Sequence, residues 1–169
     1  MIGNDVVDLA LAKKESNWKR KGFLDKIFTE TEQSLIFEAP NKDIMVWNLW
    51  SRKESAYKIY NRETGIRGYF PLQLECLYEN EISGSVLCNG IVYHTQTSIS
   101  SESIYTIAVA EKGYFMQIRN LNSNVEICKT NGIPFIIDAL LKIPKPVSIS
   151  HHGRFWKGIT LESKNPIII

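Results

Sequence analysis

The segment Trp47-Asn48-Leu49-Trp50-Ser51-Arg52-Lys53-Glu54-Ser55-Ala56-Tyr57-Lys58 combines helix-forming residues with ionisable side chains beside two tryptophans. Residues four apart on an α-helix lie one above the other, so a helix here places Glu54 and Lys58 in one patch. One interpretation is a surface ion pair worth roughly a few tenths of a kcal/mol. The tryptophans and the Arg52-Lys53 doublet favour a second interpretation, a site for an oxygen-rich anionic ligand. In that interpretation Glu54 holds a divalent cation and the lysines face phosphates.

Composition limits the class of protein before other motifs are considered. The chain has 169 residues, 44% hydrophobic and 22% charged, which fits one folded domain, and its net charge of +2 is too small to indicate nucleic-acid binding. The three cysteines show no CxxC or metal spacing, which indicates free thiols in a reducing compartment. No apolar run is long enough to span a membrane, and Gly3-Asn4-Asp5 near Met1 leaves no room for a signal peptide. We therefore expect a cytoplasmic protein without a nucleic-acid or membrane partner.

The first residues of the chain indicate a strand that carries an acidic side chain. β-Branched residues between Ile2 and Leu11 favour a short strand, and Gly3 indicates a bend or a close approach of the backbone. Such a strand places Asp5 within the folded body of the protein. The alternative is that Asp5 is only a turn or cap residue, because aspartate favours such positions.

A basic run follows, with five of the twenty Lys and Arg residues within nine positions. Its usual meaning is a solvated helix face, but a tryptophan in its middle offers an apolar anchor for an interface. We predict that an acidic partner docks on this run, through Lys13, Lys14, Trp18, Lys19, Arg20 and Lys21.

Two helices are expected after the basic run. Thr29 followed by Glu32, with Phe28 as the staple residue, is the signature of a capped helix start. Pro40 marks a break, and a second helix is predicted from about Asp43 to Asn61, ending near 64–65. We expect this helix pair to present Glu54 to Asp5.

From Ile66 onward, alternating apolar and polar residues predict antiparallel strands, and Asn89-Gly90 is a strong hairpin signal. The polar segment 120–131 is expected to be a loop or irregular link. The fold class predicted is α+β, with helices packed on an antiparallel sheet. We divide the single domain 1–169 into a metal-binding core (1–111), a link (112–131) and a C-terminal element (132–169).

The C-terminal element contains Ser148-Ile149-Ser150-His151-His152-Gly153-Arg154. Adjacent histidines on a strand point to opposite faces, so His151 and His152 are not expected to hold one metal ion together. Either histidine alone is a hydrogen-bonded core or surface residue in the simplest interpretation. With Ser150, Gly153 and Arg154 close by, a phosphate-binding turn is the alternative.

Taken in order, these motifs resemble those of the 4′-phosphopantetheinyl transferases. The matching elements are Gly3-Asn4-Asp5, Phe28-Thr29 with Glu32, Trp50-Ser51-Arg52-Lys53-Glu54-Ser55 with Lys58, and Ser148-Ile149-Ser150-His151. The resemblance implies Mg²⁺-dependent transfer of the phosphopantetheine arm of coenzyme A to a serine of an acyl or peptidyl carrier protein. It implies Asp5 and Glu54 as metal ligands, Glu54 and Lys58 as catalytic residues, and coenzyme A contacts from Lys53, Lys58, Ser150, His151, Gly153 and Arg154. The proton of the carrier serine passes either to a metal-bound water or to Glu54.

The order of motifs is similar to that of the short holo-acyl-carrier-protein synthases, whereas some details look like the longer surfactin-type enzymes. We interpret the chain as a permuted or shortened member. Two positions depart from the longer type: Val7 stands where an acidic residue is common, and Ile133 replaces the lysine of a Gly-Lys-Pro element. A basic contact to coenzyme A is therefore missing or supplied elsewhere. Because short members are trimers with sites between subunits, His151 is expected to serve either its own chain or a neighbour in a homo-oligomer.

Two rival functions remain at this stage. A metal-dependent nuclease also uses Asp, Glu and Lys, but its lysine usually follows the acid by two residues, whereas Lys58 follows Glu54 by four. A non-catalytic module that binds a carrier protein or a nucleotide would retain the fold and lose the chemistry. The presence of Asp5, Glu54 and Lys58 favours the enzyme over both.

Overall fold

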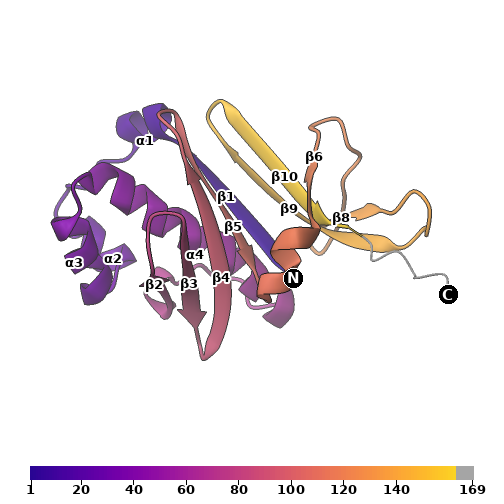
Figure 1. Ribbon diagram of the computed structural model, residues 1–169, viewed down its shortest axis with the longest axis horizontal. Helices are drawn as coiled ribbons and strands as arrows, with labels where there is room; N and C mark the ends of the chain where they lie inside the picture. Colours follow the sequence, from indigo (N-terminus) through magenta and orange to yellow (C-terminus); the bar gives the residue numbers. More distant parts are fainter. Residues whose placement is uncertain (163–169) are drawn as a thin grey trace.

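The computed structural model describes residues 1–162, in which helices cover an antiparallel sheet and a second sheet lies beside it (Figure 1). The helices are α1 (Leu9–Glu15), α2 (Phe23–Ile27), α3 (Glu30–Glu38) and α4 (Lys42–Thr64), with the 3-10 turns η1 (Pro71–Gln73) and η2 (Lys112–Gln117). The strands are β1 (Ile2–Asp8), β2 (Leu74–Tyr78), β3 (Ser83–Cys88), β4 (Ile91–Ile99), β5 (Ser103–Val109), β6 (Ile118–Leu121), β7 (Cys128–Thr130), β8 (Ile133–Ile137), β9 (Pro144–His152) and β10 (Phe155–Leu161). The predicted α+β class is confirmed. Within residues 1–162, no helix has both the length and the apolar character needed to cross a membrane.

Helix α4 packs along the first sheet, whose strand order is β1-β5-β4-β3-β2 with every neighbouring pair antiparallel. The helix begins after Asn41, whose side chain accepts a hydrogen bond from the Ile44 N–H, and ends at Gly65 in the left-handed conformation. Gly3 lets β1 approach α4 closely, because a Cβ there would lie 2.0 Å from the Ser55 carbonyl oxygen. The core between helix and sheet includes Leu49, Ala56, Ile59, Val86 and Ile104.

The second sheet has the order β6-β10-β9-β8-β7, and β1 runs between the two sheets (Figure 1). The predicted link 112–131 is corrected here, because it contains η2, β6 and β7. Strand β6 pairs with β10, which makes it part of the sheet. Strands of three or four mostly polar residues are too short to show an alternating pattern in the sequence.

The predicted capping box at the start of α3 is confirmed. Thr29 Oγ1 accepts the Glu32 N–H at 3.3 Å, and Glu32 Oε2 accepts the Thr29 N–H at 2.8 Å. Glu32 is also completely buried, and its Oε1 accepts the backbone N–H of Cys76 at 2.7 Å. Glu32, the second member of the capping box, therefore ties α3 to the edge strand β2.

Lys53 is the cation that pairs with this buried carboxylate. Its Nζ lies 2.6 Å from Glu32 Oε2 and donates hydrogen bonds to the carbonyls of Ile27 and Pro71. The side chain has no exposed surface, so the predicted contact between Lys53 and coenzyme A is wrong. Its neighbour Arg52 is equally buried and donates to the Asn48 side chain and to the carbonyls of Asn80, Glu81 and Ser83.

Replacing Lys53 by Met should lower the free energy of unfolding by about 3–5 kcal/mol, because it leaves the Glu32 carboxylate buried without its cation. Urea unfolding followed by circular dichroism measures this loss. The control is Arg119→Met, which breaks the exposed Arg119–Glu162 pair and should change stability little. Equal stability of the Lys53→Met protein and the wild type would show that the buried pair does not hold α4 in place.

Candidate active site

Side chains of β9 accept hydrogen bonds from the backbone of β1, on the edge of β1 that does not pair with β5. The donors are alternate N–H groups of β1 and the acceptors are alternate side chains of β9: Asn4 to Ser148 Oγ, Val6 to Ser150 Oγ and Asp8 to His152 Nδ1, at 2.9, 3.1 and 2.8 Å. We call these contacts the β1–β9 ladder. Because they recur at every second residue of both strands, they fix the second sheet in register against β1.

Asp5 lies in the middle of the ladder. Its Oδ1 accepts a hydrogen bond from Ser150 Oγ at 3.0 Å and lies 3.7 Å from Lys58 Nζ. Burial raises the pKa of Asp5, while the charge of Lys58 and the hydrogen bond from Ser150 oppose that rise. The carboxylate is thus held in position where added positive charge is favourable.

Glu54 lines the same cavity as Asp5, as the sequence predicted. The cavity has a volume of about 220 Å³, and its wall also includes Trp47, Trp50 and His151. Burial first, and then the charge of Asp5, raise the pKa of Glu54 to about 7, against the effect of Lys58. No hydrogen bond from residues 1–162 contributes to that pKa, and Glu54 lies on the cavity wall.

Lys58 lies where this cavity meets a larger groove. Its Nζ donates hydrogen bonds to the carbonyls of Asn4 and Ile149 at 2.6 and 3.3 Å, which draws α4, β1 and β9 together beside Asp5. The side chain is 29% exposed and lines the groove. Its positive charge therefore acts on both the carboxylates and the groove.

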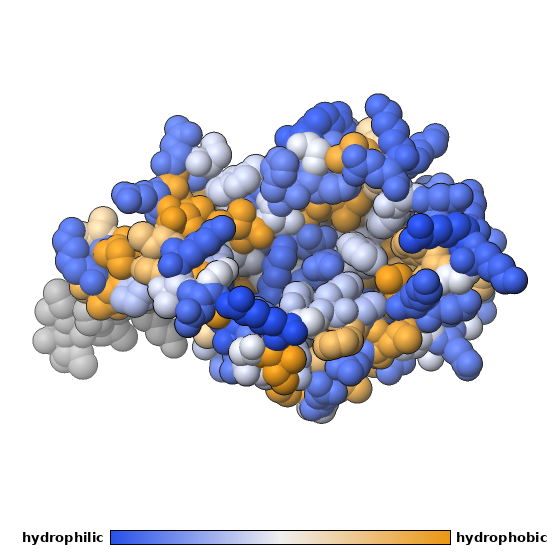
Figure 2. Space-filling model, turned by 180° about the vertical axis from the view of Figure 1, so that it is seen from behind, coloured by the Kyte–Doolittle hydropathy of each residue, from blue (hydrophilic) through white to orange (hydrophobic). Residues whose placement is uncertain are grey.

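The groove has a volume of about 410 Å³ and runs between the C-terminal half of α4 and strands β7, β8 and β9. Its described wall contains the cations Lys58, Arg62 and Lys129 and the imidazole of His151, but no carboxylate. His151 lines both the groove and the Asp5–Glu54 cavity. In the view from behind, the surface is hollowed near its middle, where hydrophilic and intermediate residues gather (Figure 2).

Three residues predicted to contact coenzyme A instead stabilise the junction of β1 and β9. Ser150 is used by the ladder and by Asp5. Arg154 donates to both carboxylate oxygens of Asp8 and to Glu102, and it holds the pKa of Asp8 well below its usual range. A Cβ on Gly153 would lie 2.5 Å from Asp8 Oδ2. None of the three lines the groove, and their contacts with coenzyme A stay predictions, as does the one for His151.

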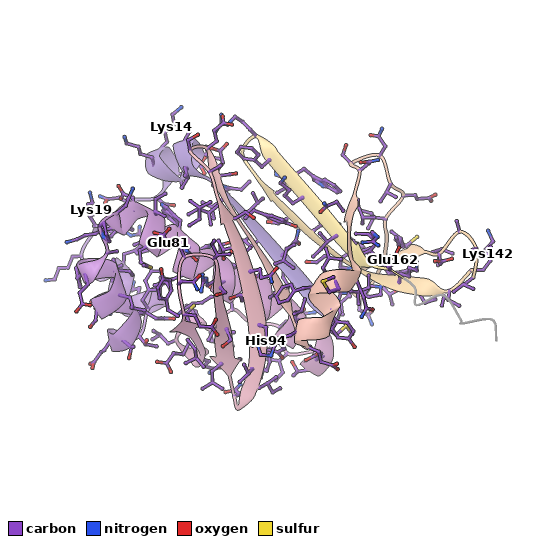
Figure 3. All side chains as sticks on the ribbon, in the orientation of Figure 1. Lys14, Lys19, Glu81, His94, Lys142 and Glu162 are labelled. Atoms are coloured by element: carbon purple, nitrogen blue, oxygen red, sulfur yellow. The ribbon has the colours of Figure 1, made fainter. Side chains whose placement is uncertain are left out.

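The basic run lies on α1 and the turn after it. Its cations Lys13, Lys14, Lys19, Arg20 and Lys21 are exposed, and Lys14 and Lys19 point outward from the helical layer in Figure 3. Trp18 differs from this pattern: it is only 8% exposed, and its Nε1 donates to Asp43 Oδ1 at 2.6 Å. Its predicted role as an exposed anchor is corrected to that of a core residue.

A shallow cavity connects the basic run with the carboxylates. It has a volume of about 320 Å³, and Lys13 and Lys19 lie on its wall. It shares Ser16 and Trp47 with the Asp5–Glu54 cavity. A partner docked on the basic run would therefore lie next to Asp5 and Glu54.

The Asp5–Glu54 pair fits Mg²⁺ better than metals that need many protein ligands. Within residues 1–162, no group of three or more His, Cys, Asp or Glu side chains is arranged to hold a metal ion. Mg²⁺ commonly takes one or two carboxylates and completes its shell with waters and substrate phosphates. The charge of Asp5 contributes to the raised pKa of Glu54, so a cation bound near both carboxylates would be stabilising.

Sequence reasoning missed two cations of the groove and one member of the ladder. Arg62 follows Lys58 by four residues, so helical periodicity alone would have placed both on one face. Lys129 and His152 carry no such signal, because their positions depend on how β7, β8 and β9 pair and pack.

The family model of the 4′-phosphopantetheinyl transferase superfamily matches residues 1–118. The chain belongs to this superfamily. The resemblance drawn from the sequence motifs is thus confirmed, and with it the class of enzyme, a phosphopantetheinyl transferase. A curated relative, the holo-[acyl-carrier-protein] synthase of Caldanaerobacter subterraneus subsp. tengcongensis, is 29% identical in an alignment of 118 positions that covers 64% of this chain and 91% of that protein.

Two solved structures are similar to this phosphopantetheinyl transferase in fold. Helicobacter pylori holo-[acyl-carrier-protein] synthase in complex with coenzyme A gives a TM-score of 0.52 at 16% identity, covering 64% of this chain and 98% of that one. The Thermotoga maritima holo-[acyl-carrier-protein] synthase gives 0.50 at 15% identity, covering 85% and 83%. The family match ends at residue 118, so Lys129, His151 and the β9 side of the ladder lie beyond it.

The pH dependence of the free energy of unfolding should reveal that the folded protein disfavours the ionised form of Glu54. Its pKa is about 7 in the folded protein against an ordinary value of 4.5, so folding favours the protonated form. Its contribution to stability is therefore full below pH 4.5 and is lost as the pH rises through 7, by on the order of 3 kcal/mol. Urea unfolding at pH 5 and pH 8, with a chelator present, measures the loss. Glu54→Gln should remove most of it, and an unchanged pH dependence in this variant would contradict the assignment.

Proposed function

We propose that this chain transfers the 4′-phosphopantetheine arm of coenzyme A to a serine of an acyl carrier protein, with Mg²⁺ as cofactor. The supporting observation is that Asp5 and Glu54 line one cavity, which adjoins a cationic groove at Lys58 and His151. Coenzyme A is polyanionic, so a groove with cations and no described carboxylate on its wall suits it. The name of the curated holo-[acyl-carrier-protein] synthase supports the same acceptor.

Each side chain of the site has a distinct role in this proposal. Asp5 and Glu54 hold Mg²⁺, and Ser150 keeps the Asp5 carboxylate in position. When bound, Mg²⁺ would supply positive charge to oxygens of the diphosphate whose P–O bond breaks. Lys58 neutralises a phosphate oxygen, and His151 contacts the coenzyme from the opposite wall of the groove.

The transfer itself is a substitution at phosphorus. The carrier serine Oγ attacks the phosphorus that bears the pantetheine arm, and the bond from that phosphorus to adenosine 3′,5′-bisphosphate breaks. The serine proton passes to Glu54, whose oxygens receive no hydrogen bond from residues 1–162. The products are the phosphopantetheinylated carrier and free adenosine bisphosphate.

We infer that one chain completes this site without a neighbour. The side chains of β9 that bond β1 belong to the same chain as Asp5, and so does His151. Asp5, Glu54 and His151 line the cavity, and Lys58 and His151 line the groove. The proposal therefore treats these residues as one catalytic unit, whatever the oligomeric state.

Asp5→Asn and Glu54→Gln should each reduce transfer at least about 100-fold, because each removes a charged ligand of the metal. The assay incubates the protein with coenzyme A, MgCl₂ and a panel of apo carrier proteins, and reads the intact mass of each carrier. Circular dichroism should show both variants folded. Full activity of the double variant would rule out a shared Mg²⁺, and absence of labelling by the wild type would favour a non-catalytic binding module.

Reversing Lys19, Arg20 and Lys21 to Glu should weaken carrier binding about tenfold and reduce its salt dependence. Carrier proteins are acidic, and charges at the rim of an interface act mainly on encounter, with screening over about 8 Å at physiological salt. Coenzyme A affinity should stay within about twofold, because the three residues do not line the groove. Parallel titrations with carrier and coenzyme A test this. Unchanged carrier affinity, or an equal loss for both ligands, would contradict the docking site.

A further inference from the structure

His152 has one ring nitrogen bound in the β1–β9 ladder and one that is free. Its Nδ1 accepts the backbone N–H of Asp8 at 2.8 Å. A ring nitrogen that accepts a hydrogen bond carries no proton, so the proton of this neutral imidazole is on Nε2. Within residues 1–162, Nε2 has no hydrogen-bond partner, and it is not one of the side-chain atoms that are both buried and unpaired. His152 therefore holds an N–H donor in a fixed orientation with access to a ligand.

The side chain of His152 lines the Asp5–Glu54 cavity and not the cationic groove, whereas His151 lines both. The same cavity adjoins the one beside the basic run, with which it shares Ser16 and Trp47. A group that moves from the groove towards a carrier docked on the basic run therefore moves to the side of the site where His152 lies.

The wall of the Asp5–Glu54 cavity determines what the free donor meets there. The described wall contains two carboxylates and neither lysine nor arginine. A phosphate oxygen beside a metal ion held by these carboxylates would therefore find only uncharged donors on the wall. A neutral N–H stabilises charge that develops on such an oxygen without adding a second cation next to the metal. The ladder keeps the ring in this form, because a doubly protonated imidazole cannot accept the Asp8 hydrogen bond.

We propose that His152 Nε2 donates a hydrogen bond to a non-bridging oxygen of the phosphoryl group while that group moves from coenzyme A to the carrier serine. His152 forms no covalent bond and keeps its proton, so Glu54 remains the acceptor of the serine proton. The inference rests on the proposed function, because it takes this transfer as the reaction. It adds a catalytic residue outside the motifs that carry the family resemblance, since the last of them ends at His151.

Two substitutions separate the roles of the two ring nitrogens. In His152→Asn the amide oxygen takes the place of Nδ1 and can accept the Asp8 N–H, but no group reaches the position of Nε2. In His152→Gln the longer side chain places an amide N–H near the position of Nε2, and the ladder contact is lost. If His152 only stabilised the ladder, His152→Asn would be the more active of the two. The proposal requires the opposite order.

Transfer to an apo carrier, followed by intact mass, gives kcat and the KM of each substrate. His152→Asn should melt close to the wild-type temperature and lose at least about tenfold in kcat, with both KM values within about twofold, because a contact made mainly in the transition state lowers kcat alone. His152→Gln should melt at a lower temperature and still have a kcat at least about threefold above that of His152→Asn.

Thr160→Val is the control for loss of stability in the same sheet. Thr160 Oγ1 donates to the Pro146 carbonyl at 2.8 Å, and Thr160 lines neither the cavity nor the groove. This variant should melt at a lower temperature with an unchanged kcat, which separates a weaker fold from a missing donor.

Three results would overturn the inference: a wild-type kcat in His152→Asn, a His152→Gln protein slower than His152→Asn, and a raised KM for coenzyme A with unchanged kcat. If circular dichroism shows His152→Asn to be unfolded, His152→Gln is compared with His152→Met. Both lack the ladder contact and only glutamine has an N–H donor, so equal kcat values would also contradict the role of His152. Failure of the wild type to label any carrier would refute the proposed function itself, whereas a labelling wild type with a fully active His152→Asn protein refutes this inference alone.

Discussion

The β1–β9 ladder is the constraint on which the site depends. Asn4 and Val6 are buried, and an unsatisfied buried N–H costs about 1–3 kcal/mol. Each serine of the ladder also donates from the same hydroxyl: Ser148 to Asn4 Oδ1 at 2.7 Å and Ser150 to Asp5 Oδ1 at 3.0 Å. One hydroxyl therefore satisfies the backbone and orients a side chain at once. A shift of one residue in register would lose both functions and move His151 away from Asp5.

The orientation of helix α4 about its own axis decides whether Glu54 and Lys58 face the β1–β9 ladder. Arg52 and Lys53 fix this orientation from the side of the helix that faces α3 and the β2–β3 turn, where each finds several fixed acceptors. Glu54, Lys58 and Arg62 follow at four-residue intervals and consequently share the face that lines the cavity and groove. Buried ion pairs add little net stability, but they penalise any other rotation strongly. The buried contacts of Arg52 and Lys53 on one face of α4 thus determine where the side chains on its other face lie.

Local signals in the sequence predicted the parts of the fold that depend on local physics. The Thr29–Glu32 cap, the Asn89-Gly90 hairpin and the shared face of Glu54 and Lys58 need only neighbouring residues, and each appears in the structure. The roles of Lys53 and Trp18 were misassigned because a lysine or tryptophan in a polar segment looks the same whether it is exposed or buried. Only the distant partners Glu32 and Asp43 decide between these states.

The same limit explains why Ser150 and Arg154 looked like coenzyme contacts. A serine and an arginine beside a glycine turn are typical of phosphate sites, and nothing within that segment reveals that Asp5 and Asp8 of β1 are their acceptors. These partners are 145 and 146 residues away in the chain. The elements could be predicted separately, whereas the contact between the first strand and the last hairpin could not.

The distribution of charge between the two cavities matches what the proposed binding of a cation and a polyanion requires. The charge of Asp5 adds to burial in raising the pKa of Glu54, and burial raises the pKa of Asp5, so their cavity favours positive charge. The groove has the opposite character, and Lys58 lies where the two meet. Ile133 stands in the groove wall at the position that the Gly-Lys-Pro resemblance assigns to a lysine, and Arg62 of α4 lines the same groove. The C-terminal turns of a helix are a favourable place for such a charge, since the helix dipole stabilises a cation there and offsets part of its burial.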